Sequence, residues 1–290
     1  MKDKGDDHIR DVRGRAVVLP SSPRRIVSLV PSITETLFDF GCADRLMART
    51  DFCIRPAETA RVPSVGGTKN PDLDFVRALR PDLAFANQEE NREPDVAALE
   101  ASGIPVFLTF PRSIAQAVAD LEKFATLLDA GEDAREMIAS IKRAARNRRS
   151  HVRPFVPVFV PIWRDPWMTF NADTFAHDML AAHGLYNVFA DRDRRYPLAA
   201  DLGLGAAKSA DGRDTRYPRV TLEEAAARRP GLVLLPDEPY PFTQTDAGDV
   251  ARALDLPAER VRLIDGGLLF WHGTRMRRSL AEWLEILAMR

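Results

Sequence analysis

Residues 25–35 have the sequence RIVSLVPSITE, in which a short apolar strand is followed directly by the start of a helix. The apolar run 26–30 is bounded by turn and cap signals and is typical of a buried strand. Ser32 and Glu35 stand three residues apart, the spacing of a capping box, in which each side chain satisfies a backbone N–H group of the other residue. The predicted helix ends at Gly41. A strand that leads into a helix in this way favours an α/β fold.

The same alternation of strands and helices continues through the first half of the chain. The apolar runs and their flanking Pro and Gly residues predict strands at 45–50, 83–86 and 106–109, and helices at 72–79 and 94–102. Short buried strands that alternate with helices indicate a lobe with a mainly parallel sheet.

The middle of the chain has only a helical pattern. Apolar residues recur at helical spacing from Ile114 to Leu128 and again from Met137 to Ala145. A helix at this point is stiffer than a Gly/Ser linker, so we expect it to join two lobes rigidly. The expected organisation is an N-terminal α/β lobe at 1–131, a connecting backbone helix at 132–150, and a C-terminal α/β lobe at 151–290.

The strand pattern resumes in the last part of the chain. Strands are expected at 156–162, 232–235 and 261–264, and helices begin at Asp173, at Thr221 and near Thr274. The segment 191–219 is polar and rich in Gly, Asp and Arg, so we expect a long loop with little structure of its own.

An internal similarity links the two halves. Residues 74–81 (DFVRALRP) and 223–230 (EEAAARRP) each open with a carboxylate, end in Arg-Pro, and precede an apolar strand. The halves are therefore predicted to be two versions of one Rossmann-like α/β lobe. An acidic residue in the first turn of a helix is favoured by the helix dipole even without a partner, so Asp74 and Glu223 need no function on this ground alone.

Composition and charge exclude several classes of protein. The chain has 290 residues, of which 29% are charged, and a net charge of −1, so a nucleic-acid partner is not expected. No window is apolar enough for a membrane span, and residues 1–11 contain no apolar run of the kind that a secretory signal needs. The sequence as written therefore predicts no export signal, and a cytoplasmic location if Met1 is the native start.

The motifs of common enzymes are missing from the sequence. It contains no GxSxG, no GxxxxGK[ST] and no HExxH, and the glycines at 203–205 do not follow a strand. The two cysteines, Cys42 and Cys53, are too few for a four-thiolate site. We therefore expect no enzyme, no catalytic residue and no intrinsic cofactor.

Several fragments, taken in order, make the chain recognisable. They are the stretch 25–35 quoted above, then Val65-Gly66-Gly67 with Asn70-Pro71-Asp72-Leu73, 79–83 (LRPDL), 102–106 (SGIPV), 173–180, Gly184 with Asn187-Val188-Phe189, and 229–233 (RPGLV). In order and spacing the chain resembles the helical-backbone periplasmic substrate-binding proteins of ABC importers, the family that takes up vitamin B12 and ferric siderophores.

That resemblance implies a function and a partner. It implies a two-lobed monomer that binds a small ligand in a cleft between the lobes, in the periplasm, and delivers it to an ABC permease and ATPase complex. In this family each lobe presents a carboxylate that docks on permease arginines, and the matching positions here are Asp74 and Glu223.

Ligand contacts are expected in the loops that follow strands and at helix starts. The candidates in the first lobe are Ser32, Phe52, Lys69, Asn87 and Glu89, and those in the second are Trp163, Trp167, Tyr240, Phe270, Trp271 and Arg275. Aromatic side chains at such positions suit a flat, partly apolar ligand such as a corrin or a porphyrin. Each of them is equally compatible with a role in a lobe core.

The candidate metal ligand is His272, because neutral imidazole is the commonest protein donor to transition metals. The alternative is a surface histidine with only water around it. The expected ligand is a cobalt- or iron-containing chelate, with cobalamin or another corrinoid first, then haem or a ferric siderophore. A triscatecholate siderophore needs several cations, and only Lys69, Arg92, Arg164 and Arg275 are placed to supply them. The rival hypothesis is a cytosolic corrinoid or metal-chelate carrier or sensor on the same fold.

Overall fold

The computed structural model describes residues 9–19, 22–149 and 155–281. The chain forms two compact units. The first contains the described residues up to Pro111 together with 115–143 and 272–277, and the second contains 112–114, the described part of 144–271, and 278–281. The chain thus returns to the first unit near its end.

The first unit is built on a parallel four-stranded sheet of order β2-β1-β5-β6. Its strands are β1 (Ile26–Ser28), β2 (Leu46–Arg49), β5 (Leu83–Asn87) and β6 (Val106–Thr109), and a short antiparallel pair is formed by β3 (Gly66–Gly67) and β4 (Asn70–Pro71). The helices are α1 (Pro31–Asp39), α2 (Leu73–Leu79), α3 (Glu93–Ala101), α4 (Ile114–Leu127) and α5 (Glu132–Arg149), with 3-10 turns at Ala43–Arg45 and Ala57–Arg61.

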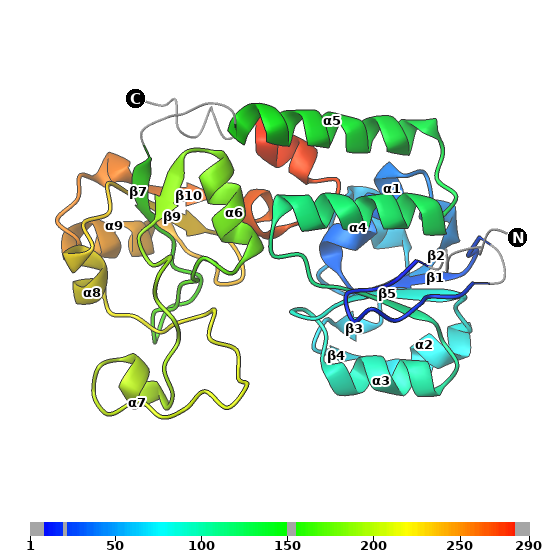
Figure 1. Ribbon diagram of the computed structural model, residues 1–290, viewed down its shortest axis with the longest axis horizontal. Coiled ribbons are helices and arrows are strands. Elements are labelled where there is room, and N and C mark those ends of the chain that lie inside the picture. Colours follow the sequence, from blue (N-terminus) through cyan, green and yellow to red (C-terminus); the bar gives the residue numbers. More distant parts are fainter. Residues whose placement is uncertain (1–8, 20–21, 150–154, 282–290) are drawn as a thin grey trace, which may run out of the picture. The chain divides into compact units, whose positions relative to one another are not determined.

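Alternate strand residues supply the two faces of this sheet. Val27, Ala84 and Val106 face a core cluster that includes Val76 of α2 and Leu99 of α3. On the other face the ring of Phe124, from α4, packs edgewise on the rings of Phe85 and Phe107, with centroids 4.8 and 5.5 Å apart. Helices α2 and α3 therefore cover one face, and α4 covers the other (Figure 1).

The second unit repeats this design with a parallel sheet of order β10-β9-β7-β8. Its strands are β7 (Val156–Phe159), β8 (Leu185–Asn187), β9 (Leu232–Pro236) and β10 (Val261–Ile264). The helices are α6 (Phe175–Ala182), α7 (Leu198–Asp201), α8 (Leu222–Ala227), α9 (Gln244–Ala253) and α10 (Gly267–Phe270), with a 3-10 turn at Ala258–Arg260. The buried core joins β7 and β9 to α8 and α9 through Phe159, Val233, Ala225 and Val250.

These elements confirm the predicted fold class, two α/β units with parallel sheets. Within the described residues, no helix combines the length and apolar content needed to cross a membrane. Of the 18 residues of α5, those up to Arg143 group with the first unit and the rest with the second.

The predicted capping box at Ser32 and Glu35 is wrong. The N-cap of helix α1 is Val30, two residues before Ser32, and it makes no side-chain cap hydrogen bond. The carboxylate of Glu35 instead accepts two hydrogen bonds from Arg275, at 2.7 and 2.8 Å. A capping box does form at the start of α9, where Thr243 and Asp246 satisfy each other's backbone N–H groups.

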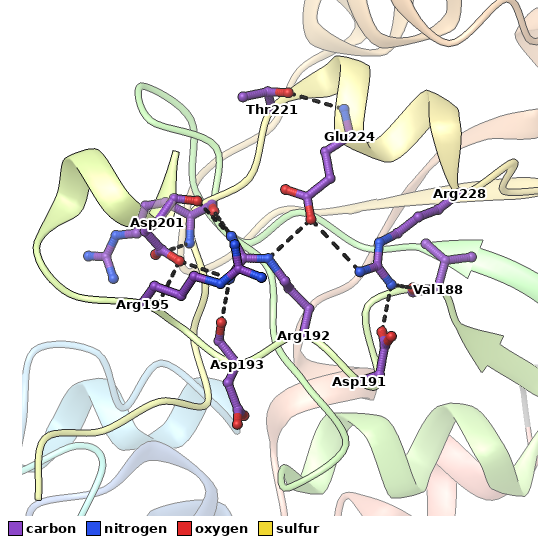
Figure 2. Close-up of polar contacts among 10 residues, drawn as sticks. Val188, Asp191, Arg192, Asp193, Arg195, Asp201, Thr221, Glu224 and Arg228 are labelled. Atoms are coloured by element: carbon purple, nitrogen blue, oxygen red, sulfur yellow. Dashed lines mark hydrogen bonds and ion pairs between the residues drawn. The ribbon is translucent and has the colours of Figure 1, made fainter. Parts of the chain in front are cut away.

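The segment 191–219 is mostly a loop, as predicted, but it has more structure of its own than the sequence indicated. This segment contains α7 and is organised around Asp201, whose side chain is fully buried (Figure 2). The Asp201 carboxylate accepts hydrogen bonds from the Arg192 guanidinium at 3.0 Å and from the backbone N–H groups of Arg195 and Arg219 at 2.9 and 2.7 Å. Arg192 also donates a hydrogen bond to Glu224 of α8, at 3.1 Å. This bond connects the segment 191–219 to helix α8.

Candidate functional site

The carboxyl edge of the first sheet gathers several predicted site residues, because parallel strands all end at the same edge. Ser32 lies in the first turn of α1, just after β1, and Asn87 is the last residue of β5. The two side chains are buried, with 4% and 2% of their residue surfaces exposed. Asn87 donates from its amide to Thr109, at the end of β6, and accepts from the N–H groups of Glu89 and Glu90. These bonds fix the orientation of its amide.

His272 lies on top of these two residues. Its Nε2 is 3.3 Å from Nδ2 of Asn87, and its Nδ1 is 3.5 Å from Oγ of Ser32. Because Oδ1 of Asn87 is occupied by two N–H donors, the Asn87 amide group facing His272 is a donor and Nε2 must accept. The ring is therefore the neutral tautomer with its proton on Nδ1. Burial lowers the pKa of His272 to about 4, which keeps the ring neutral at physiological pH.

The chain segment that carries His272 is held firmly on α1. Gly273 has φ +92°, and a Cβ at this position would lie 2.5 Å from Oγ1 of Thr36. The backbone N–H of Thr274 donates to that same hydroxyl at 3.2 Å. Arg275 forms a buried ion pair with Glu35. The Arg275 side chain is 3% exposed and the Glu35 side chain is 16% exposed. Three consecutive residues, 273–275, thus fix the imidazole above the edge of the sheet.

The pairing of His272 with Ser32 does not suit nucleophilic catalysis. A general base for a serine needs an unprotonated ring nitrogen directed at the hydroxyl. Here the proton is on the nitrogen that faces Ser32, and the other nitrogen accepts from Asn87. Ser32 and Asn87 therefore position the imidazole instead of activating a nucleophile.

Loops of the same unit carry further predicted site residues. Lys69 is exposed, and its ammonium group donates to the backbone carbonyl of Glu89. Burial raises the pKa of Glu90, the next residue, against the opposing effect of Lys69. Phe52 is 60% exposed on the loop after β2 and lies beside Gly67, where its ring would be 3.6 Å from an added Cβ. Of the predicted residues of this unit, Phe52, Lys69, Glu89 and His272 thus reach the surface.

A site for a bare metal ion needs several donors close together. Within the described residues, no three His, Cys, Asp or Glu side chains are grouped so that they could hold an ion. His272 alone could supply one nitrogen to a metal whose other positions are filled by a chelating ligand, after its hydrogen bond with Asn87 is released.

The second unit presents an aromatic cluster after β7 and β9. The rings of Trp163 and Tyr240 pack edgewise with centroids 5.6 Å apart, and Tyr240 lies 4.7 Å from Phe242. Trp167 stacks on Phe242 at 5.9 Å with an interplanar angle of 3°. The sequence predicted three of these four residues. Phe242 lies two positions after Tyr240 in the same loop, which was expected to supply ligand contacts, but Phe242 is 5% exposed and belongs to the core cluster of the second unit.

The cation of this cluster is already neutralised. Arg164 forms ion pairs with Asp246, in the first turn of α9, and with Asp249 of the same helix. Its guanidinium lies 5.5 Å from the centre of the Trp167 ring. Sequence reasoning missed Asp246, a residue that the T-x-x-D spacing with Thr243 could have placed at a helix start.

The remaining predicted contacts lie inside the packing. Phe270 is partly buried and packs edgewise on Phe170, at 6.2 Å, and Trp271 is 8% exposed. Arg275 is 5% exposed in its pair with Glu35, in the first unit. A ligand contact by Trp271 or Arg275 would require a rearrangement of that packing.

Asp74 and Glu223 occupy the same position in two similar helices. Each is the second residue of its helix, after the N-caps Asp72 of α2 and Thr221 of α8. The Asp74 side chain is 93% exposed and pairs with Arg77 at 2.7 Å. Glu223 is exposed, and a backbone N–H bond and the Thr221 hydroxyl lower its pKa. Its neighbour Glu224 is held instead by Arg192 and Arg228.

Comparisons with known proteins agree with this architecture. A family model described as periplasmic binding protein matches residues 26–237. A vitamin B12-binding protein of Yersinia pestis is 25% identical over 222 residues, which are 76% of this chain and 72% of the relative.

Two solved structures share the fold. The periplasmic vitamin B12-binding protein of Vibrio cholerae matches with a TM-score of 0.71 and 17% identity, over 93% of this chain and 99% of that one. A periplasmic haem-binding protein of Roseiflexus sp. RS-1 matches with a TM-score of 0.70 and 20% identity, over 90% and 96% of the two chains.

Proposed function

Because the chain belongs to the periplasmic binding protein family, we propose that it captures a metal-containing small molecule for an ABC importer and performs no chemistry on it. The proposed location is the periplasm. The observation that carries the proposal is the neutral imidazole of His272, fixed by Ser32 and Asn87 at the carboxyl edge of the first sheet. A neutral imidazole is a suitable axial donor to a cobalt or iron ion that is already chelated in a plane.

A corrinoid is the first choice of ligand. The four cations that a triscatecholate siderophore would need are all engaged: Lys69 with a carbonyl, Arg92 with Asp95, Arg164 with Asp246 and Asp249, and Arg275 with Glu35. The surface around His272 instead offers hydrogen-bonding groups such as Glu89, and the second unit offers Trp163 and Tyr240. The hydrogen-bonding groups of the first unit suit amide substituents, the aromatic side chains of the second suit a flat ring, and the B12-binding relatives support the same choice.

The permease is the proposed partner, through Asp74 and Glu223. Their shared helix position and exposure support this role, since each carboxylate can reach an arginine of another protein. The test is charge reversal at both positions, Asp74→Lys with Glu223→Lys, in a transport assay with the cognate importer. Stimulation of transport should be lost while ligand affinity stays unchanged. Reversal of Asp44, an acid on a 3-10 turn of the first unit, is the control.

The ligand itself is tested by calorimetric titration with cyanocobalamin, cobinamide, haem and a ferric siderophore. We expect tight 1:1 binding of a corrinoid and weaker binding of the siderophore. Tight binding of the siderophore alone would overturn the choice of ligand. If none of the four binds, the proposed function is wrong.

A further inference from the structure

A small three-segment ribbon at the carboxyl end of β7 carries a row of side chains. Trp163 pairs with Met168 in an antiparallel bridge, and Met168 pairs with Arg219 in a second one. The backbone N–H of Thr169 donates to the carbonyl of Pro218, and that of Val220 donates to the carbonyl of Trp167. Met168 and Arg219 are therefore a non-hydrogen-bonded pair, the arrangement in which opposed side chains are closest.

The row Trp163, Met168 and Arg219 points away from the core. The flanking residues Trp167 and Val220 lie on the opposite side of the ribbon, where both pack into the core cluster of the second unit. Trp163 is 43% exposed, and Met168 and Arg219 are partly exposed. We call these three residues the Trp163–Arg219 face. It consists of an indole, a thioether and a guanidinium at its end.

The guanidinium of this face is not neutralised in the way that Arg164 is. Its Nη1 donates to the carbonyl of Tyr217 at 3.2 Å, and among the described residues no carboxylate forms an ion pair with it. Burial, and then the charge of Arg194, lower the pKa of Arg219. Asp201 acts in the opposite direction, but its carboxylate is already ion-paired with Arg192. Positive charge therefore remains at this end of the face.

We propose that the Trp163–Arg219 face binds a flat ligand that carries an anionic group at its edge, with the ring on Trp163 and Met168 and a carboxylate or phosphate on Arg219. A guanidinium presents donors in a fixed plane that matches the oxygens of either group. The inference rests on the proposed function, and it adds a requirement for a negative charge on the ligand. Sequence reasoning did not predict this requirement, because the segment 191–219 was expected to be a long loop with little structure of its own.

A pair of fluorescent dyes tests the face without any assumption about the natural ligand. They are 8-anilinonaphthalene-1-sulfonate and N-phenyl-1-naphthylamine, which differ by the sulfonate. The variants are Arg219→Gln, the charge-preserving Arg219→Lys, and the control Arg260→Gln. Arg260 is an exposed arginine just before β10, at the opposite edge of the same sheet. Arg219→Gln should weaken the sulfonate dye about tenfold and the neutral dye less than about threefold, since a hydrogen bond to a charged group is lost. The control should bind both dyes like the wild type. The Lys variant should keep part of the preference for the sulfonate dye, because it keeps the charge but loses the planar pair of donors.

Two pairs of chelates then identify the anionic group. Haem carries carboxylates that haem dimethyl ester lacks, and cobalamin carries a phosphodiester that cobinamide lacks. In the wild type the charged member of the cognate pair should bind about tenfold tighter, and Arg219→Gln should remove the difference. The inference would be overturned if Arg219→Gln weakened the binding of both members of a pair equally, or if it weakened the binding of neither dye. The proposed function would be unaffected by either result. A third outcome is that no chelate binds, while the difference in affinity between the two dyes still depends on Arg219. The proposed function would then be wrong, but the inference about the Trp163–Arg219 face would stand.

Discussion

Asn87 and His272 are 185 residues apart in the sequence, and their side chains meet at 3.3 Å at the carboxyl edge of the first sheet. The contact determines the chemistry of the site, because an amide that donates to Nε2 leaves the imidazole proton on Nδ1. It also depends on the return of the chain to the first unit at 272–277.

The protonation of His272 is the first consequence that can be measured. Its pKa in the folded protein, about 4, lies below the ordinary value of 6.5, so the unfolded chain binds more protons between these two pH values. The free energy of unfolding should therefore fall as the pH is lowered from about 6.5 to about 4, by up to about 3 kcal/mol. Nitrogen chemical shifts of the ring, assigned with His272→Gln, should show the Nδ1–H tautomer at pH 6. A titration midpoint near 6.5 would contradict the geometry.

Replacement of Gly273 by alanine should destabilise the first unit by more than the unfavourable positive φ of a non-glycine residue explains. In Gly273→Ala the new Cβ meets the hydroxyl of Thr36 at 2.5 Å and the backbone oxygen of Ser32 at 3.1 Å. Gly103→Ala is the matched control, since Gly103 has φ +79° and no atom within 4 Å of an added Cβ. Urea denaturation should show a loss for Gly273→Ala that is about 2 kcal/mol larger than the control's loss. Equal losses would mean that the segment moves away from α1 without cost.

The buried ion pair of Arg275 with Glu35 should contribute far more to the free energy of unfolding than an exposed ion pair does. Glu35→Ala leaves the Arg275 charge in a site where the side chain is 3% exposed, so we expect a loss of about 3 kcal/mol in the free energy of unfolding. The comparison is Glu132→Ala, which breaks a pair with Arg135 whose side chains are 62% and 84% exposed, and which should cost less than about 1 kcal/mol. Similar values in chemical denaturation for both variants would show that water reaches the Arg275 pair.

Asp201 should control the order of the segment 191–219. In Asp201→Asn the side chain keeps one acceptor oxygen for three donors, the Arg192 guanidinium and the N–H groups of Arg195 and Arg219. Hydrogen exchange of those two amides should become about a hundredfold faster, as expected when a buried charged contact is broken. Peptides from β5 and β6 serve as the internal control and should not change. Unaltered exchange at Arg195 and Arg219 would show that the segment is held by other contacts.

Local patterns were sufficient to predict most of the fold. The strands at 106–109 and 261–264 have the predicted bounds. The observed bounds of β5, α2 and α3 differ from their predicted bounds by at most one residue. These elements are short apolar runs or helices with clear breakers such as Pro81 and Gly103, so tertiary contacts do not have to decide them.

The site depended on contacts that no local pattern records. Glu35 had the spacing of a capping residue, but Arg275, 240 residues later, binds it. The charges of Arg192 and Asp201 resembled those of a solvated loop, yet the two side chains are 6% and 0% exposed. A sequence pattern indicates that a residue is polar, but not whether a distant segment will cover it. The ligand-binding and docking roles of the predicted residues remain predictions.

The most direct test of the account is a calorimetric titration of wild type, His272→Gln and the control His177→Gln with aquocobalamin, from whose cobalt an imidazole can displace the bound water. His177 is a partly buried histidine on α6, in the second unit. The account predicts 1:1 binding by the wild type and the control, and at least tenfold weaker binding by His272→Gln, since an axial nitrogen donor is lost. Wild-type affinity in His272→Gln would contradict the role of the imidazole as the residue that binds the metal chelate.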